Sequence, residues 1–107
     1  MATYTNVSYA VKNVSTSGST VTTVSSGTLA IGSLVASNTS ASPITVDVYV
    51  TRSAVNYYLV KAATVPVGGS LEVIQGNRVM LQASDALVVL SSAATSADAW
   101  VSGMTVV

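Results

Sequence analysis

Few side chains in this sequence could carry out chemistry, and the acidic residues are the first to consider. Acid–base reactions such as glycoside hydrolysis use two carboxyl groups that face each other across a substrate. The acidic residues are Asp47, Glu72, Asp85 and Asp98. Asp47 falls in a strand-like segment, whereas Asp85 and Asp98 fall in turn-like contexts, where an Asp side chain bonds its own backbone. We therefore expect these carboxyl groups to lie apart, and we predict no catalytic residues.

The other common chemistries lack their residue types. The chain has no histidine and no cysteine, which excludes Ser-His-Asp and Cys-His catalysis and the most frequent zinc sites. No segment clusters acidic ligands for calcium. Gly68 and Gly69 precede a strand-like segment and are not followed by Gly-Lys-Ser/Thr, so we expect a β-turn there and no phosphate loop. The sequence predicts a protein that is not an enzyme and that holds no cofactor and no metal.

The aromatic residues are better suited to binding. Exposed aromatic side chains form sugar-binding platforms and subunit contacts. The candidate interface residues are Tyr4, Tyr9, Tyr49 and Tyr58, and we expect Tyr49 and Tyr58 to share the outer face of one hairpin. Trp100 is expected in the core of the last strand. The aromatic residues keep open one function, a carbohydrate- or receptor-binding module.

Charge is sparse and balanced along the chain. Four basic and four acidic residues give zero net charge, and charged residues make up 7% of the sequence, against about 25% in typical soluble domains. Neutral, sparsely charged surfaces tend to associate. We expect a homo-oligomer such as a trimer in preference to a monomer with a hydroxyl-rich coat. The balanced charge offers no footprint for nucleic acid or an anionic membrane, so the expected partners are proteins.

Targeting signals are not recognised. The apolar runs are far shorter than the ~20 residues that a transmembrane helix needs, and the first ten residues lack the pattern of a signal peptide. Without cysteine, nothing in the sequence demands an oxidising compartment.

Short strand-like segments separated by turn residues dominate the pattern. Valine and other β-branched residues suit a half-buried pleated surface, and no window shows a sustained helical period. Regular short strands with turn signals between them indicate a β-sandwich or jelly roll. The sequence predicts a single all-β domain, a jelly-roll-like β-sandwich of about eight short strands. The expected strand segments are 20–24, 28–38, 44–52, 57–65, 70–74, 78–82, 86–92 and 99–107.

The first residues are expected to differ from the rest. Residues 1–19 are predicted to form an extended N-terminal arm, carrying one strand at Tyr4 to Val14, ahead of a sandwich domain at 20–107. A Ser/Thr/Gly-rich segment costs little to extend. The arm is therefore our candidate for reaching a neighbouring subunit.

The segment 44–51, ITVDVYVT, alternates apolar and mostly polar residues, which predicts a strand with one buried face. A hairpin after this strand is predicted to place Val50 opposite Leu59 and Lys61 opposite Val48. That register puts Lys61 on the apolar face. Either a bulge shifts the pairing, or Lys61 points inward near a sheet edge.

Three segments carry a family resemblance. Residues 29–74, LAIGSLVASNTSASPITVDVYVTRSAVNYYLVKAATVPVGGSLEVI, contain a polar Asn-Thr-Ser turn, a Thr/Val strand, a Tyr-Tyr-Leu-Val strand and a Pro-Val-Gly-Gly corner. NRVMLQASDALVVLSS contains an L-x-x-x-D-x-[IL]-x-V element, in which Leu81 and Asp85 match. ADAWVSGMTVV follows as a closing strand. From about Thr20 to its end the chain resembles small virion structural proteins of tailed bacteriophages, especially phages of cyanobacteria and other marine bacteria.

The resemblance implies a β-sandwich virion component without enzymatic activity. Some members of this group decorate capsids, and others belong to tails, necks or fibres. The leading hypothesis is a capsid decoration (cement) protein that bridges and stabilises major capsid subunits and is located in the virion. The alternatives are a tail, neck, baseplate or fibre component, and the carbohydrate- or receptor-binding module.

Overall fold

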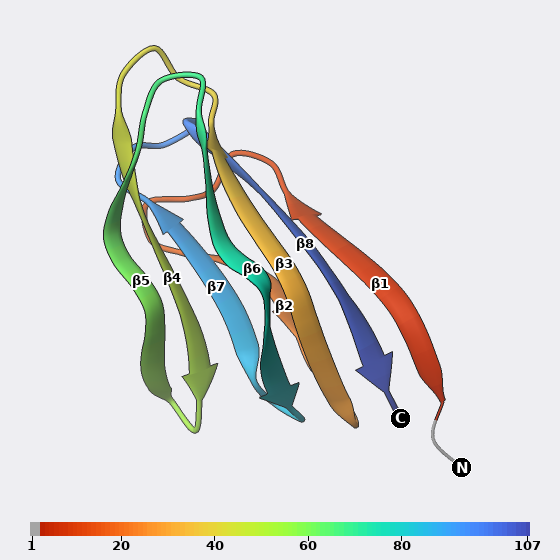
Figure 1. The fold of residues 1–107 in the computed structure, drawn as a ribbon. Helices are drawn as coiled ribbons and strands as arrows, with labels where there is room; N and C mark the ends of the chain where they lie inside the picture. The colour runs from red at the N-terminus through yellow and green to blue at the C-terminus, as the bar shows by residue number, and fades with distance from the viewer. Residues whose placement is uncertain (1–2) are drawn as a thin grey trace.

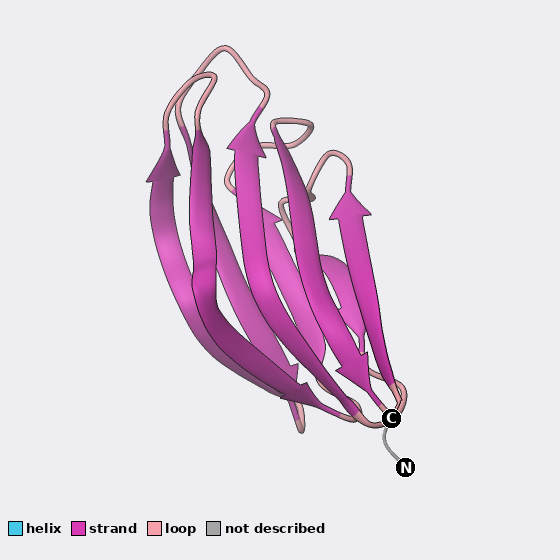
Figure 2. Ribbon diagram, turned by 45° about the vertical axis from the view of Figure 1, so that its right-hand side comes forward, coloured by secondary structure: helices cyan, strands magenta, loops and turns pink. Residues whose placement is uncertain are grey.

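The structure is an all-β sandwich of two four-stranded sheets (Figure 1). The computed structural model describes residues 3–107 and, at 75–77, the backbone only. The strands are β1 (Tyr4–Val11), β2 (Ser19–Thr23), β3 (Thr28–Asn38), β4 (Ile44–Arg52), β5 (Val55–Val65), β6 (Ser70–Gln82), β7 (Ala86–Ser91) and β8 (Ala97–Val106). Figure 2 shows strands and loops, and no helix, within residues 3–107. These residues accordingly contain no helix long and apolar enough to cross a membrane. The predicted fold class is confirmed.

The strands pair as nested hairpins. β1 pairs with β8, β2 with β7, β3 with β6 and β4 with β5, all antiparallel. β8 also pairs with β3, and β7 with β4. The result is sheet A, in the order β1-β8-β3-β6, and sheet B, in the order β2-β7-β4-β5. Eight antiparallel strands wound over two sheets in this way form a jelly roll.

The inner faces of the two sheets form one hydrophobic core. Successive side chains of a strand point to opposite faces, so alternate residues are buried in β3 and β4. In β4, Ile44, Val46, Val48 and Val50 are at most 7% exposed, as the alternation in the sequence predicts. Leu29, Ile31 and Leu34 of β3 contribute the same kind of face from sheet A.

The segment predicted as an N-terminal arm belongs to the sandwich. β1 pairs with β8 from Tyr4↔Val106 to Val11↔Ala99, and Val14 is fully buried. Val7, Tyr9 and Val11 alternate along β1 and pack against the core, which is the period of a half-buried strand. The predicted boundary between residues 19 and 20 is therefore wrong, although the expected strand does begin at Tyr4. Residues 1–2 lie outside the described part.

Two segments predicted as separate strands form one. Residues 70–74 and 78–82 both belong to β6, whose backbone runs without a break through residues 75–77 between them. Its partner β3 is a single strand, and the extra residues of β6 are absorbed as register shifts against it. Such shifts are β-bulges, which bend a strand without ending it.

The β4–β5 hairpin contains the bulge that the position of Lys61 required. Near the turn, Val50 pairs with Tyr57, and the predicted pairing of Val50 with Leu59 is wrong. Two register shifts follow along the hairpin. The first of them, between Tyr49 and Val48, adds one residue to β5 ahead of Lys61, so Lys61 turns outward and its side chain is 65% exposed. Of the two alternatives, the bulge is correct.

The Gly68-Gly69 segment is a β-turn, as predicted. The Gly69 N–H donates to the Pro66 carbonyl oxygen at 3.0 Å, which is the bond that closes a β-turn. Gly68 has a φ of 70°, in the left-handed region that this turn requires and that glycine adopts without strain. The turn leads directly into β6.

Candidate interaction surfaces

The charged side chains form separate ion pairs on different strands. Lys12 binds Asp98 at 3.0 Å, Arg52 binds Asp85, and Lys61 lies 3.8 Å from Asp47. No group of three or more acidic side chains able to hold a metal is found in the part of the chain that the structure describes. Asp47, Asp85 and Asp98 are therefore engaged in three different places.

Asp85 is the buried member of these pairs, with a side chain 2% exposed at the turn between β6 and β7. Arg52 donates to both of its carboxylate oxygens, at 2.9 and 2.5 Å, and the Gln82 N–H donates at 2.8 Å. These hydrogen bonds, that of Arg52 first, hold the pKa of Asp85 below its ordinary value although burial opposes them. The pair fastens the end of β4 to the β6–β7 turn. Leu81, which matches the same family element, is 1% exposed in the core, so both matching residues are structural.

Asp98 joins the chain after β1 to β8. Its Oδ1 accepts a hydrogen bond from the Asn13 N–H at 3.0 Å, and its Oδ2 accepts one from Lys12 at 3.0 Å. The bond from Asn13, and then that from Lys12, lower the pKa of Asp98 against the effect of burial. Asp98 was expected in a turn, and it lies instead near the start of β8.

The first candidate surface is the hairpin patch, which we define as the exposed apolar residues on both faces at the start of the edge strand β5. Its members are Val55 (49% exposed), Tyr57 (56%), Tyr58 (44%) and Leu59 (36%). Tyr49 and Tyr58 pair across the hairpin, and their ring centroids lie 5.0 Å apart at an interplanar angle of 46°. The prediction that these two tyrosines share an outer face is confirmed.

Neighbouring groups hold the hairpin patch in place. Lys61 lies 4.4 Å from the centroid of the Tyr58 ring, a cation–π distance, and also reaches Asp47. The turn residues Ser53 and Ala54 both have positive φ, 53° and 63°. A two-residue turn of this kind matches the twist of the strands it joins, so β4 and β5 stay paired up to the turn, where Arg52 pairs with Val55.

The other two candidate tyrosines lie elsewhere. Tyr4 is 66% exposed at the start of β1. Tyr9 is half-buried against the core and lines a hollow of about 140 Å³ with Thr22 and Val107. The four candidate tyrosines therefore do not form a single interface. Tyr49 and Tyr58 are together on sheet B, and Tyr4 and Tyr9 are both on β1 of sheet A.

The second surface is the outer face of sheet A. Trp100 lies here and is 55% exposed, so its predicted place in the core is wrong. Successive side chains of a strand point to opposite faces. Since Ala99 and Val101 on either side of Trp100 are buried, Trp100 points outward. Met80 of β6 is 51% exposed. The apolar residues Ala99 and Val101, which alternate with Trp100 in the sequence, are the pattern that could have predicted its outward position.

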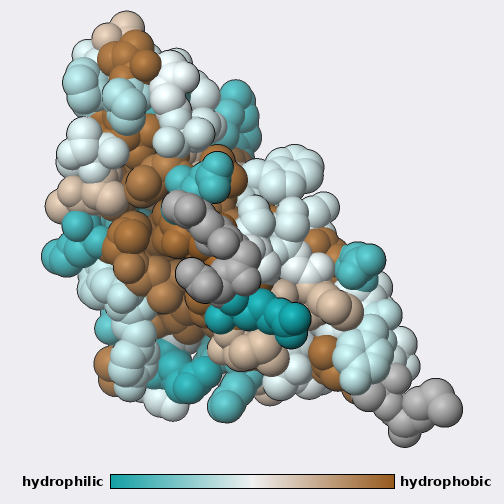
Figure 3. Space-filling view, viewed as in Figure 1, coloured by the Kyte–Doolittle hydropathy of each residue, from teal (hydrophilic) through white to brown (hydrophobic). Residues whose placement is uncertain are grey.

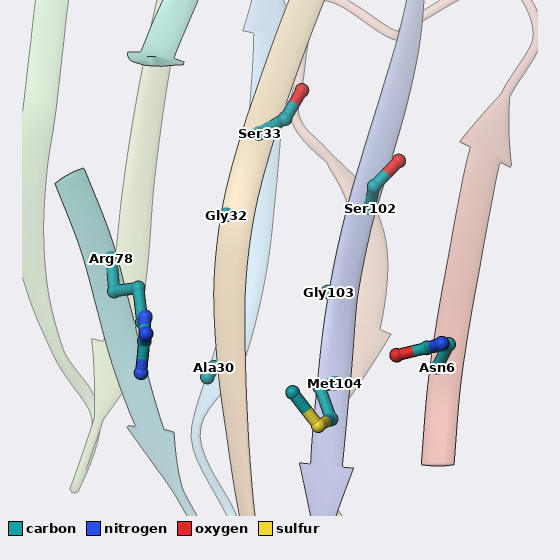
Figure 4. Close-up of a pocket in the computed structure, with 8 residues that line it drawn as sticks. All are labelled: Asn6, Ala30, Gly32, Ser33, Arg78, Ser102, Gly103 and Met104. Atoms are coloured by element: carbon teal, nitrogen blue, oxygen red, sulfur yellow. The ribbon is translucent and has the colours of Figure 1, made fainter. Parts of the chain in front are cut away.

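Two hollows indent this face. One of about 350 Å³ is lined by residues of all four strands: Asn6, Ala30, Gly32, Ser33, Arg78, Ser102, Gly103 and Met104 (Figure 4). In Figure 4 the Ser33 and Ser102 side chains point out from neighbouring strands, with Met104 further along β8. The other, of about 340 Å³, lies beside Trp100 and includes Val35 and Ala10. Sequence reasoning missed this face because it depends on three strands distant in the chain.

A third apolar region lies along the edge between β5 and β6. Figure 3 shows hydrophobic side chains gathered on the left of the molecule, where Figure 1 places β4 and β5. Val60 and Ala63 of β5 and Val73 and Val79 of β6 pack against the core and stay partly exposed. The sheets thus leave some core-packed residues accessible along this edge.

Comparisons with known proteins give one structural similarity. No protein-family model matches the chain, and no curated protein matches it. The fold is similar to a solved chain described with the words "Bacillus endospore appendages form a novel family of disulfide-linked pili". The TM-score is 0.55 at 14% identity, over 96% of this chain and 85% of that one. At this identity the similarity concerns the fold alone.

Proposed function

We propose that the protein is a structural subunit of a phage particle, a capsid decoration (cement) protein that docks on the capsid through the hairpin patch. The main support for this proposal is the exposure of the apolar side chains in the hairpin patch. Four apolar side chains within residues 55–59 are each at least 36% exposed, in a chain whose charges are sparse and include three ion pairs. An exposed apolar surface of this kind is typical of a site that binds another protein.

The hairpin patch has the features of a docking anchor. Aromatic residues dominate the energetics of protein interfaces. Tyr57 and Tyr58 point to opposite sides of the edge strand β5, so a partner that covers both wraps this edge of the hairpin. The Tyr49 ring and Lys61 hold Tyr58 in one orientation. The Tyr58 side chain therefore loses little conformational entropy when a partner binds. The expected work of the protein is mechanical, because each copy that bridges two capsid subunits adds contact free energy to the shell.

The fold supports a role in assembly. Jelly rolls occur in viral capsid proteins and in lectins, and fold alone does not specify function. The structural neighbour is described with endospore appendages that form disulfide-linked pili. Together with the sequence resemblance to virion proteins, these similarities favour a structural subunit.

The structural neighbour favours a second candidate, a subunit of a surface filament. That neighbour is described as part of a disulfide-linked pilus. This chain has no cysteine, so any filament it formed would need non-covalent contacts. Electron microscopy of the purified protein separates the two candidates, since a filament subunit polymerises by itself and a decoration protein does not.

The deciding experiment is gold-labelled antibody localisation on particles of the phage that carries the gene. Label spread over the head supports the decoration role. Label confined to the neck, tail or fibres supports the alternative virion positions instead. Particles without any label would contradict a virion role.

The docking surface is tested by substitution. A Tyr57→Ser, Tyr58→Ser double variant should occupy purified capsid shells at least tenfold less at equal concentration, because it removes both aromatic anchors. Tyr4→Ser is the matched control, since Tyr4 is as exposed but lies on β1. Equal occupancy by the two variants would remove the hairpin patch from the proposal.

A further inference from the structure

The register of sheet A arranges its outer face in three rows that cross β1, β8 and β3. We name them the tryptophan row, the serine row and the methionine row. In order they are Ala10–Trp100–Val35, Ser8–Ser102–Ser33 and Asn6–Met104–Ala30. The first and third rows are mostly apolar and are separated by small hydroxyl side chains.

The rows differ in height. Trp100 is 55% exposed and rises from the tryptophan row. The larger hollow, about 350 Å³, lies over the serine and methionine rows, where Gly32 and Gly103 contribute no side chain (Figure 4). One side of the serine row therefore carries the projecting Trp100 with the hollow of about 340 Å³ beside it, and the other side carries a hollow large enough to take an indole ring.

We propose that this face is the contact surface of a twofold-symmetric homodimer, with the symmetry axis along the serine row. Rotation about that axis exchanges the tryptophan and methionine rows. Trp100 of each copy then fills the hollow beside Met104 of the other, with a sulfur–aromatic contact. The inference rests on the proposed function, because it assigns the self-association expected of a structural subunit to one surface.

The size of the face fits a stable dimer. Four strands about 4.8 Å apart and ten residues of β8 at about 3.3 Å each span about 19 by 33 Å, or roughly 600 Å² in projection. Side-chain relief raises the accessible area toward the roughly 800 Å² per partner of a standard interface. Two sheets packed face to face in this way form a layer like the core of a β-sandwich.

The charges on the face fit the same symmetry. Glu72 of β6 pairs with Val35 and so extends the tryptophan row. Arg78 lines the larger hollow near the methionine row. The twofold rotation brings Glu72 of one copy over the region of Arg78 of the other, so opposite charges face each other across the two copies of β6. An isologous interface makes each such contact twice.

Cysteine cross-linking tests the position of the axis. On the axis, Ser102 of one copy faces Ser102 of the other, and the chain has no cysteine of its own. A Ser102→Cys variant should form a disulfide-linked dimer under mild oxidation at low micromolar concentration. Ser25→Cys, in an exposed loop, is the control and should stay monomeric on non-reducing gels. Equal cross-linking of both variants, or of neither, would overturn the proposal.

Sedimentation and fluorescence test the contact itself. Trp100 is the single tryptophan of the chain, so its emission should shift to the red on dilution, together with dissociation of the dimer in sedimentation velocity. Trp100→Ala should weaken dimerisation about thirtyfold, as for an interface hot spot. Tyr57→Ala, a residue of nearly equal exposure at 56%, should leave it unchanged. The expected Kd is micromolar, so a protein that is still monomeric at on the order of 100 μM would refute the twofold contact. A trimer would refute it as well.

The two proposals fail separately. If the hairpin variant loses shell occupancy while the protein stays monomeric, docking stands and the dimer falls. If Ser102→Cys cross-links but no particle carries label, the dimer stands and the virion role falls.

Discussion

At the residue scale, burial decides what each ion pair contributes. Asp85 is 2% exposed, whereas Asp98 is 28% exposed and its partner Lys12 is 75% exposed. An exposed pair adds little to stability, while breaking a pair with a buried member leaves a charge without compensation. The Arg52–Asp85 pair should therefore contribute more to the stability of the fold than the Lys12–Asp98 pair.

Substituting the basic partner of each pair tests this inequality. Arg52→Gln should lower the free energy of unfolding several times more than Lys12→Gln does, because buried Asp85 loses two charge-assisted hydrogen bonds. Lys12→Gln should lower it by less than about 0.5 kcal/mol. Urea unfolding of both variants measures the difference. Similar losses would show that Asp85 is solvated in the folded protein.

The same carboxyl groups predict a dependence on pH. The pKa values of Asp85 and Asp98 are lower in the folded protein than their ordinary value of 3.8. Each group therefore stabilises the fold fully above that value, and the stabilisation is lost as the pH falls through the folded pKa. The free energy of unfolding should be level from pH 7 to about 5 and decline below about 4.

The Asp85→Asn variant isolates this effect. It should be less stable than the wild type at pH 7, and its stability should fall less steeply in acid, since one of the two titrating groups is gone. Unfolding by urea at a series of pH values measures both curves. Parallel curves for the two proteins would assign the acid sensitivity to other groups.

At the scale of elements, the β4–β5 turn carries strain that the sequence does not relieve. Hairpin turns with positive φ at both central residues favour Asn-Gly, but this chain has Ser53 and Ala54 there. Side chains with a Cβ adopt that region at a cost of roughly 1–2 kcal/mol. The strain is located next to the hairpin patch.

Replacing one turn residue should relieve that strain. Ala54→Gly should raise the free energy of unfolding by about 1 kcal/mol, because glycine adopts positive φ freely and this gain exceeds the entropy that glycine adds to the unfolded chain. Ala41→Gly, in an exposed loop with no positive φ, should lower stability slightly. Thermal unfolding compares the two. A loss of stability in Ala54→Gly would contradict the strained turn.

At the scale of the whole molecule, the first and last strands close sheet A together. β1 pairs with β8 over its full length, so the jelly roll joins residues about a hundred positions apart. Pairings that distant make folding slow, because the loop entropy is lost before the contacts form. The first residues are thus part of the folding unit.

Truncation tests this conclusion. A chain without residues 1–11 should unfold at a lower denaturant concentration or lose soluble yield, because β8 becomes an edge strand paired only with β3 and the inner residues of β1 leave the core. Tyr4→Ser, which keeps the backbone pairing, should be nearly neutral. A truncated chain as stable as the full one would restore the arm predicted from the sequence.

Local patterns in the sequence determined the fold class and much of the strand layout. The segments 28–38 and 44–52 match β3 and β4 residue for residue, because a strand with one buried face must alternate. The absence of histidine and cysteine likewise removed whole classes of chemistry without any structure. These conclusions depend on neighbours in the chain, which a sequence displays directly.

Tertiary structure alone decided which strands meet and which faces remain open. The register between β4 and β5 depends on bulges, and the continuity of β6 depends on its partner β3. The exposure of Trp100 and the three rows of sheet A depend on β1, β8 and β3 lying side by side. Residues in such pairs are distant in sequence, so their pairing is set by the packing of the whole core and by no local pattern.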